Sequence, residues 1–313
     1  MSEIQLDLSI IIVNWNTREM LRDCLQSVFD TAADITFDVW VVDNGSSDDS
    51  QQMVRDAFPQ VELIANQDNK GFAGANNQAL SRAKGRHVLL LNSDTLVHGD
   101  VLSASVRYLD DNPDVGAMGC RVLNTDGTLQ ITGSQVPSLL NLSLQATGLN
   151  RLPGGFFDRF QMVRWDRRDA RDLDVIFGCY LMVRRSVIEQ VGLLDDTFFF
   201  YGEETDWCFR IAKGGWRLVL APVGEITHFG GGSVKKLNHK RNIMLSEGTI
   251  RFHRKHYGWW GGAACWVLLG FFNLSRAIIW SLLGLAGSEK VRDTAQNFRR
   301  VVMHFREAWP RDV

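Results

Sequence analysis

The sequence predicts an α/β fold, with a mostly parallel central sheet flanked by helices and a helical extension at the C-terminal end. Three observations lead to this prediction. Short apolar runs rich in β-branched residues alternate with segments in which apolar residues recur at helical spacing. The connections between these segments are short. The last quarter of the chain instead combines a basic stretch with a long uncharged stretch, which sets it apart.

Five apolar runs are expected to form strands of the sheet. They lie at 8–15, 37–43, 61–66, 87–94 and 115–123. Helices are expected between them, at 17–30, 48–58, 71–83 and 99–112. In the first of these helices, Leu21, Leu25 and Val28 follow one another at helical spacing. Ligands of such sheets bind beyond the carboxyl ends of the strands, which is where Asp43 and Asp94 are expected.

Residues 123–174 are less regular than the segments before them. The dipeptide Asp126-Gly127 predicts a hairpin, and a long excursion follows it. A strand and a helix are then expected in 175–192, a helix ending at glycine in 202–215, and a further strand in 216–222.

The composition is that of a globular protein. Of the 313 residues, 45% are hydrophobic and 22% are charged, which is ample for one large domain or a domain with an appendage. The net charge of −2 does not indicate a nucleic-acid partner. The five cysteines form no CxxC pair, which argues against a zinc site or a disulfide framework and fits a reducing compartment. The N-terminal residues lack the basic region of a signal peptide, so a cytoplasmic location is expected.

Four acidic residues are candidates for chemistry: Asp43, Asp94, Glu204 and Asp206. Each also has an ordinary structural explanation. Asp43 precedes a turn sequence, and Glu204 and Asp206 fall in the first turn of a helix, where acids interact favourably with the helix dipole. Asp94 follows a strand, and a divalent cation with open positions for phosphates needs such oxygen ligands. His228, beside a glycine-rich loop and a basic stretch, is the second candidate metal ligand.

Six segments in order resemble the inverting glycosyltransferases of family 2, in the rhamnosyltransferase-like branch of that family. The segments are SIIIVNWN, VVDNGSSDDS, NKGFAGANNQAL, LLLNSDT, FGCYLMVRRSVIEQVGLLDDTFFFYGEETDWCFRIAKGGWRLVLAP and THFGGGS. The resemblance runs from Leu8 to Ser233. Each segment alone is a weak signal, whereas six in the family's order are specific.

This resemblance implies the A-type glycosyltransferase fold, a nucleotide-diphosphate sugar donor, and Mg²⁺ or Mn²⁺ as cofactor. By position, the residues implied to line the nucleotide-sugar site are Asn16, Asp43, Asn69, Gly71, Asn77, Asn92 and Asp94. Asp94 matches the last position of the family's Asp-x-Asp motif, and His228 matches a histidine that ligates metal in part of the family. Asn92 replaces the first acid of the motif, so the metal would be held by Asp94, His228 and the diphosphate.

The catalytic base implied by the resemblance is Glu204, with Asp206 as the alternative, because Glu203-Glu204 stands where the family has Glu-Asp. In a single in-line displacement, a carboxylate deprotonates the acceptor hydroxyl as it attacks the anomeric carbon. A cation stabilises the charge on the departing diphosphate. Glu204 follows the aromatic run at 198–201, so partial burial is expected to raise its pKa.

The expected division places a catalytic domain at 1–233, with a nucleotide-sugar half at 1–122 and an acceptor half at 123–233. A basic and hydrophobic helical region is expected at 234–313. Within it, residues 233–256 contain seven Lys or Arg and one acid, a net charge of +6.

Residues 258–288 carry one charge, Arg276, and three interpretations are open. A helix that spans a membrane would place Arg276 near its middle at a cost of about 2.5–3.5 kcal/mol. A buried hairpin is the second interpretation, and an interfacial or re-entrant segment is the third. The interfacial one is preferred, because tryptophans at 259, 260, 266 and 280 suit a membrane interface and the preceding basic stretch suits anionic headgroups.

The leading hypothesis is a metal-dependent inverting hexosyltransferase that is peripherally associated with the inner face of the cell membrane. It would move rhamnose from dTDP-rhamnose onto a lipid-linked or growing cell-surface polysaccharide. A UDP-hexose donor, a non-catalytic nucleotide-sugar-binding subunit and a membrane-recruited structural protein are the alternatives. A nicotinamide dehydrogenase is disfavoured, because NWNTRE rather than GxGxxG follows the first strand, and no P-loop is present.

Overall fold

The computed structural model describes residues 6–230, 239–285 and 287–311. It divides into two units, which are described separately. The first unit consists of Met1–Gln135, Val163–Phe199 and Glu204–Val234, and the second of Val136–Met162, Phe200–Glu203 and Lys235–Val313. Most of the predicted glycine-rich loop after His228, part of the predicted basic stretch, and the expected domain boundary at 233/234 lie outside the described residues.

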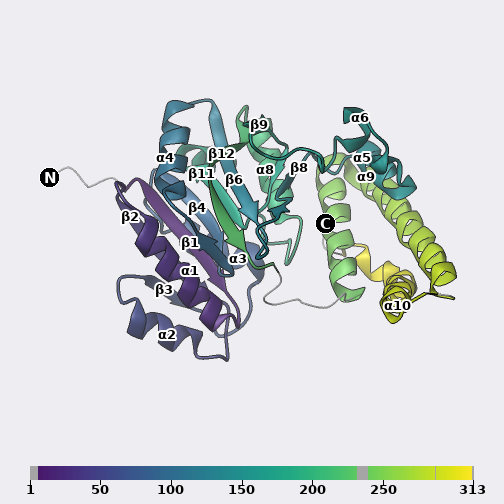
Figure 1. The fold of residues 1–313 in the computed structure, drawn as a ribbon, viewed down its shortest axis with the longest axis horizontal. Coiled ribbons are helices and arrows are strands. Elements are labelled where there is room, and N and C mark those ends of the chain that lie inside the picture. The colour runs from purple at the N-terminus through teal and green to yellow at the C-terminus, as the bar shows by residue number, and fades with distance from the viewer. Residues whose placement is uncertain (1–5, 231–238, 286, 312–313) are drawn as a thin grey trace. The chain divides into compact units, whose positions relative to one another are not determined.

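A mixed ten-stranded sheet forms the centre of the first unit (Figure 1). Its main path runs in the order β3-β2-β1-β4-β11-β6-β12-β5, with β7 beside β6 and β9 beside β12. The strands are β1 (Leu8–Asn14), β2 (Phe37–Asp43), β3 (Glu62–Ala65), β4 (His87–Asn92), β5 (Thr95–Val97), β6 (Val115–Leu123), β7 (Leu129–Gln130), β9 (Arg171–Asp172), β11 (Tyr180–Arg184) and β12 (Arg217–His228). A separate two-stranded sheet pairs β8 (Gly133–Ser134) with β10 (Val175–Ile176).

Helices cover both faces of this sheet. They are α1 (Arg18–Thr31), α2 (Ser50–Ala57), α3 (Gly71–Leu80), α4 (Val101–Asp111), α7 (Arg185–Val191) and α8 (Glu203–Lys213). Ile10 and Ile12 of β1 belong to a core that includes side chains of α1, α2 and α4. The intervening Ile11 is also fully buried, and α3 packs against β1 and β2. Because successive strand residues point to opposite faces, burial on both sides explains the unbroken apolar run of β1.

The parallel pairing of the first strands brings their carboxyl ends together. Asn14 of β1 lies opposite Asp43 of β2, and Val13 lies opposite Asn92 of β4. The predicted α/β fold with a mostly parallel sheet is thus confirmed, and β11 is the antiparallel insertion between β4 and β6.

The hairpin predicted at Asp126-Gly127 is present, since Leu123 of β6 pairs with Leu129 of β7. Gly127 has a φ of +79°, a conformation that favours glycine. The short strand β5 was not predicted. It pairs with β12 and places Thr95 opposite His228, so it brings the residue after Asp94 next to the candidate histidine.

The second unit is helical where the structure describes it. Its elements are α5 (Leu139–Thr147), the 3₁₀ turn η1 (Leu149–Arg151), α6 (Gly155–Asp158), α9 (His239–Gly284), α10 (Glu289–His304) and the 3₁₀ turn η2 (Phe305–Ala308). Non-helical angles at Gly258, with a φ of +71°, divide α9 into two parts. Leu142 of α5 packs in one core with Cys265 of α9, Val301 of α10 and Phe305.

Arg276 lies within this unit and contacts α5. Its guanidinium donates hydrogen bonds to the carbonyl oxygens of Gln145 (3.1 Å) and Ala146 (3.2 Å) near the end of that helix. The last carbonyls of a helix lack partners within it and attract positive charge. The single charge in the long apolar stretch is therefore satisfied inside the protein.

Candidate active site

Asp43 and Asn16 organise the loop that follows β2. The Asp43 carboxylate is fully buried and accepts hydrogen bonds from Asn14 Nδ2 (2.8 Å), the Ser46 backbone N–H (2.9 Å) and Gln51 Nε2 (2.8 Å). Asn16 has a φ of +55°, and its Oδ1 accepts from the backbone N–H of Ser47 at 2.8 Å. These bonds fix the loop at the carboxyl end of the sheet, where the two residues are predicted to face the nucleoside.

Asn69 and Gly71 shape the start of α3. Asn69 Oδ1 accepts from the Gly71 backbone N–H at 2.8 Å and lies 3.3 Å from Asn44 Nδ2. Gly71 has a φ of +74°, and a Cβ there would lie 2.5 Å from the carbonyl oxygen of Phe199. Only glycine fits this turn.

Asn77 lies six residues beyond Gly71 in α3, and its hydrogen-bond partners are in another segment. Its Nδ2 donates to the carbonyl oxygen of Leu194 at 2.8 Å, and its Oδ1 accepts from the Leu194 N–H at 3.1 Å. The side chain thus fastens the 194 segment to α3. Its contact with a nucleotide stays a prediction.

The side chains of Asp94 and His228, which are far apart in the sequence, meet at the end of the sheet. Asp94 Oδ1 lies 3.1 Å from His228 Nε2, and both side chains are largely buried. Asn92 Nδ2 lies 3.2 Å from the same histidine nitrogen. The backbone also joins the two segments, since the Phe229 N–H donates to the carbonyl oxygen of Asp94 at 2.9 Å. A carboxylate oxygen and an imidazole nitrogen that face one point form a donor set that suits Mg²⁺ or Mn²⁺.

Glu204 lies in the first turn of α8, and its carboxylate reaches the segment just before β11. Its Oε1 accepts a hydrogen bond from the Gly178 backbone N–H at 2.7 Å. Burial raises the pKa of the Glu204 carboxyl to about 7, against the opposing effects of the Gly178 N–H and of the charge on His228. A carboxyl with this pKa changes its protonation state near neutral pH, as a general base requires.

Asp206, the alternative base, is placed differently. Its side chain is fully buried and forms an ion pair with Arg210, with 2.8 Å between Oδ2 and Nε. Arg210 also donates to the carbonyl oxygens of Val191 (2.6 Å) and Leu193 (2.7 Å). Asp206 therefore helps to join α8 to the end of α7, which favours Glu204 over Asp206 as the residue available to an acceptor.

A sequence model of glycosyl transferase family 2 matches residues 9–192, more than half of the chain. The chain belongs to glycosyl transferase family 2. It is therefore a glycosyltransferase, and the family prediction made from the six sequence segments is confirmed.

Two relatives show the range of this similarity. The glycosyltransferase is 26% identical over 284 residues to the N-acetylglucosaminyl-diphospho-decaprenol L-rhamnosyltransferase of Mycobacterium tuberculosis, covering 85% of this chain and 91% of that protein. It is 27% identical over 227 residues to the low-salt glycan biosynthesis hexosyltransferase Agl10 of Haloferax volcanii, covering 71% of this chain and 67% of that protein.

Solved structures establish the A-type fold of the glycosyltransferase. The mannosyltransferase PcManGT from Pyrobaculum calidifontis, in complex with GDP-Man and Mn²⁺, superposes with a TM-score of 0.58 at 16% identity, over 98% of this chain and 86% of that one. GalNAc-T7 with UDP, GalNAc and Mn²⁺ gives 0.57 at 15% identity, over 98% of this chain and 57% of that one.

Two residues of the glycosyltransferase site were not predicted from its sequence. A Cβ at Gly178 would lie 2.5 Å from Glu204 Oε1 and 3.0 Å from the Phe72 ring, so glycine lets the backbone approach the carboxylate. Gln130 Oε1 lies 2.7 Å from His228 Nδ1. The only sequence signal for Gly178 is a glycine just before a buried strand, and Gln130 has no local signal.

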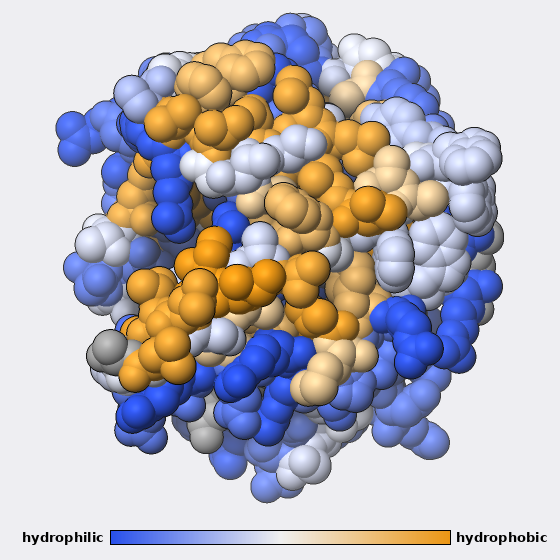
Figure 2. Space-filling model, turned by 90° about the vertical axis from the view of Figure 1, so that its right-hand side faces the viewer, coloured by the Kyte–Doolittle hydropathy of each residue, from blue (hydrophilic) through white to orange (hydrophobic). Residues whose placement is uncertain are grey.

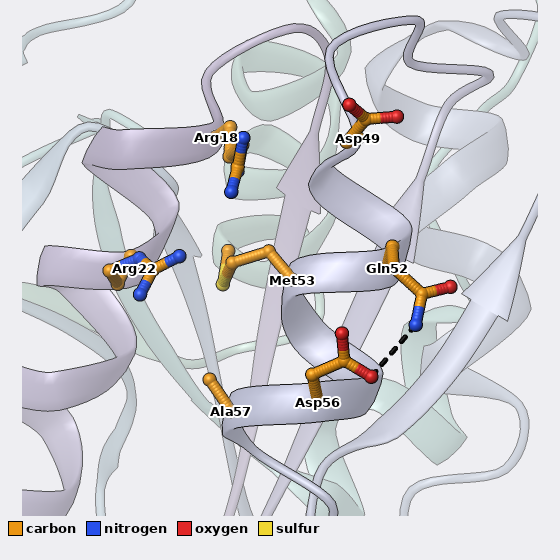
Figure 3. Close-up of a pocket in the computed structure, with 7 residues that line it drawn as sticks. All are labelled: Arg18, Arg22, Asp49, Gln52, Met53, Asp56 and Ala57. Atoms are coloured by element: carbon orange, nitrogen blue, oxygen red, sulfur yellow. Dashed lines mark hydrogen bonds between the residues drawn. The ribbon is translucent and has the colours of Figure 1, made fainter.

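A surface cavity of about 520 Å³ lies between α1 and α2 of the glycosyltransferase. Figure 3 shows its lining, with Arg18 and Arg22 on α1 facing Asp49, Asp56 and other residues at α2. Gln52 donates to Asp56 at 2.7 Å. None of the predicted site residues lines this cavity, and its two basic and two acidic side chains indicate no particular ligand.

Proposed function

We propose that this glycosyltransferase is an inverting hexosyltransferase with Glu204 as its catalytic base and Asp94 and His228 as the protein ligands of Mg²⁺ or Mn²⁺. The observation that carries the proposal is the convergence of Asp94 Oδ1 and His228 Nε2 at 3.1 Å, with Glu204 nearby. The described residues contain no group of three or more His, Cys, Asp or Glu side chains arranged for a metal. Two protein ligands leave the other positions of a six-coordinate ion to phosphate oxygens and water.

The reaction follows from these positions. The oxygen of an acceptor hydroxyl attacks the anomeric carbon of the donor sugar, and the bond from that carbon to the diphosphate oxygen breaks. Glu204 takes the hydroxyl proton as the new bond forms. The cation, when bound, stabilises the negative charge on the diphosphate. Asp43, Asn16, Asn69, Gly71 and Asn92 are proposed to shape the nucleotide-sugar site at the same edge of the sheet.

We further propose that the donor is dTDP-rhamnose and that the acceptor is lipid-linked or a growing cell-surface polysaccharide. The donor follows from the resemblance to the rhamnosyltransferase-like branch. Support also comes from the name of the mycobacterial relative, which is a rhamnosyltransferase acting on an N-acetylglucosaminyl-diphospho-decaprenol. Two solved structures of the same fold contain Mn²⁺ with a nucleotide or nucleotide sugar, in line with a divalent cation here.

A thermal-shift panel of nucleotide sugars tests the donor and the metal together. Ligands that bind only the folded state raise its stability, by about 2.7 kcal/mol at a concentration one hundred times Kd. We expect dTDP-rhamnose to raise the melting temperature with Mg²⁺ or Mn²⁺ but not with EDTA, and UDP-hexoses to have little effect. Selective stabilisation by a UDP-hexose would replace the donor and keep the reaction. No response from folded protein to any nucleotide sugar would favour a non-catalytic subunit.

The second unit is proposed to hold the enzyme on the cytoplasmic face of the membrane. One described helix, α9, is long and apolar enough to cross a membrane, and only 17% of its most apolar window is buried. Large apolar side chains are exposed along it, including Trp260 (79%), Val267 (62%) and Leu282 (63%), and Leu285 (84%) follows directly after its end. Figure 2 shows apolar residues gathered over the face that this view presents.

The packing of α10 favours a helix that lies along the membrane surface over one that spans it. Contacts join Trp266 to Phe305, Phe272 to Phe298, and Gly284 to Arg292, so α10 runs back antiparallel along the second part of α9. The outer side of α10 carries exposed charges at 289, 290, 292, 293, 299 and 300. If α9 spanned a bilayer, these charges would enter the hydrocarbon at a cost of several kcal/mol. An in-plane orientation buries the apolar stripe and leaves α10 in water.

Replacing Leu282 or Ile278, two exposed apolar residues of α9, by Asp is expected to abolish binding to vesicles that contain anionic lipid. A charge in the buried face of an interfacial helix removes apolar contact and must be desolvated. Co-sedimentation with vesicles measures the effect. Val163→Asp, at an exposed apolar position of the first unit, is the matched control and should bind like the wild type. Unchanged binding by both α9 variants would contradict the proposal.

A further inference from the structure

The orientation of the His228 ring is set by Gln130. Gln130 Oε1 and His228 Nδ1 are 2.7 Å apart, and the amide oxygen has no hydrogen to donate. The histidine must therefore carry a proton on Nδ1 for this bond to form. In the neutral ring, Nε2 then has a lone pair directed at Asp94 Oδ1 and at the Asn92 amide.

The orientation of the Gln130 amide is fixed in turn by Asn124. Gln130 Nε2 donates to Asn124 Oδ1 at 3.0 Å. Asn124 Nδ2 donates to Thr128 Oγ1 at 2.9 Å and lies 3.5 Å from the carbonyl oxygen of Leu129, which can only accept. Exchanging the oxygen and nitrogen of either amide would place two acceptors or two donors face to face.

The chain of hydrogen bonds ends at a group that can only accept. The Thr128 hydroxyl donates to Asp126 Oδ1 at 2.6 Å, so its oxygen accepts from Asn124. This bond and that of the Thr128 backbone lower the pKa of the Asp126 carboxyl, which therefore remains ionised. The direction of every donor is thus determined from the Asp126 turn to the histidine ring.

We propose that Gln130 is a positioning residue that holds His228 in the Nδ1–H tautomer, and that the hairpin from Asn124 to Gln130 supplies its orientation. The inference rests on the proposed metal role of His228, because only the Nε2 lone pair of this tautomer can bind a cation beside Asp94. The opposite tautomer would place an N–H on Nε2. This N–H would donate to Asp94, and Nε2 would have no lone pair with which to bind a cation. Removing the hydrogen-bond partner of a histidine that binds metal typically lowers the affinity for the metal about 10–100-fold.

The test reads the tautomer directly, in metal-free protein labelled with ¹⁵N-histidine at a pH where the imidazole is neutral. Long-range proton–nitrogen correlation distinguishes the protonated from the unprotonated ring nitrogen. The His228→Asn variant identifies the His228 signals among those of the seven histidines. The wild type is expected to show a protonated Nδ1 and an unprotonated Nε2 on His228.

Gln130→Met, which keeps length but removes the acceptor, is expected to shift His228 toward the Nε2–H tautomer. It should also weaken Mn²⁺ binding by calorimetry about tenfold or more. Thr128→Val acts at the exposed end of the chain of hydrogen bonds. It should shift the tautomer population of His228 in the same direction but to a smaller extent. Thr128→Ser keeps the hydroxyl and should resemble the wild type. Because Thr128 lies in a turn, this pair remains informative if Gln130→Met folds poorly.

Two results separate the inference from the function on which it rests. An unchanged His228 tautomer in folded Gln130→Met would overturn the role of Gln130, whatever the metal affinity. A changed tautomer with unchanged Mn²⁺ affinity would leave the hydrogen-bond chain established and would overturn His228 as a metal ligand.

Discussion

Transfer by the Glu204→Gln variant is expected to fall by roughly two to four orders of magnitude, while binding of the nucleotide-sugar donor is retained. Gln keeps the oxygen that accepts from the Gly178 N–H, so the first turn of α8 should keep its conformation. What is lost is the ability to take a proton from the acceptor. Initial rates of transfer and calorimetric donor binding measure the two effects separately.

Glu189→Gln is the matched control, because Glu189 is an exposed carboxylate on α7 of the same unit. It should transfer sugar at the wild-type rate. Near-normal turnover by Glu204→Gln would instead move the base to another residue, with Asp206 the next to test.

The pH dependence follows from the same carboxyl. A base must be ionised, and burial raises the pKa of Glu204 to about 7, so wild-type kcat should rise with pH through the neutral range and then level off. The stability of the fold should show the opposite trend. A carboxyl whose pKa rises on folding, from an ordinary value of 4.5, stabilises the folded state below the lower pKa and loses that contribution as pH rises through the higher one.

The Glu204→Gln variant, whose amide does not ionise, should therefore melt at the same temperature as the wild type near pH 4. Near pH 8 it should melt a few degrees higher. A variant that is less stable than the wild type at pH 8 would show that Glu204 is not held in a desolvating environment.

Replacement of Asp94 by Ala is expected to remove the metal dependence of donor binding while the protein stays folded. His228 alone would hold a hard divalent cation weakly, since such ions prefer oxygen ligands. Donor affinity measured with Mn²⁺ should fall to the value that the wild type shows with EDTA. The transfer rate should fall with it, because the charge on the diphosphate is no longer stabilised.

Asp100→Ala is the control for this variant. Asp100 is exposed, lies six residues beyond Asp94 and forms a surface ion pair with Arg107 at 2.9 Å, which contributes little to stability. Donor affinity of Asp94→Ala that still responds to Mn²⁺ as in the wild type would remove Asp94 from the metal site.

The first half of the fold could be predicted because its signals are local. The strands β1, β2 and β6 are mostly apolar and largely buried, and their predicted ends agree with the structure to within a residue. The strand β5 could not be predicted, because three residues show no periodicity. Its partner strand β12 is also far away in the sequence, since Thr95 pairs with His228, 133 positions later. Short strands of this kind depend on their neighbours rather than on intrinsic preference.

The candidate site divides in the same way. Asp43 and Asp94 could be placed at the sheet edge from the strands that precede them. The contact of Asp94 with His228, the backbone donor at Gly178 and the support from Gln130 all join segments that are far apart in the chain. The three interpretations of residues 258–288 could not be separated from the sequence, because hydropathy cannot reveal that Arg276 binds the end of α5.

That contact also bears on how the enzyme can be prepared. The stretch after Gly258 supplies Cys265, Val301 and Phe305 to the core around Leu142, and Arg276 to the end of α5. Truncating the chain to remove the apolar helix would strip these partners away and uncover new apolar surface. Polar substitutions restricted to the exposed positions of α9 should instead give a protein that needs no detergent and keeps its core intact.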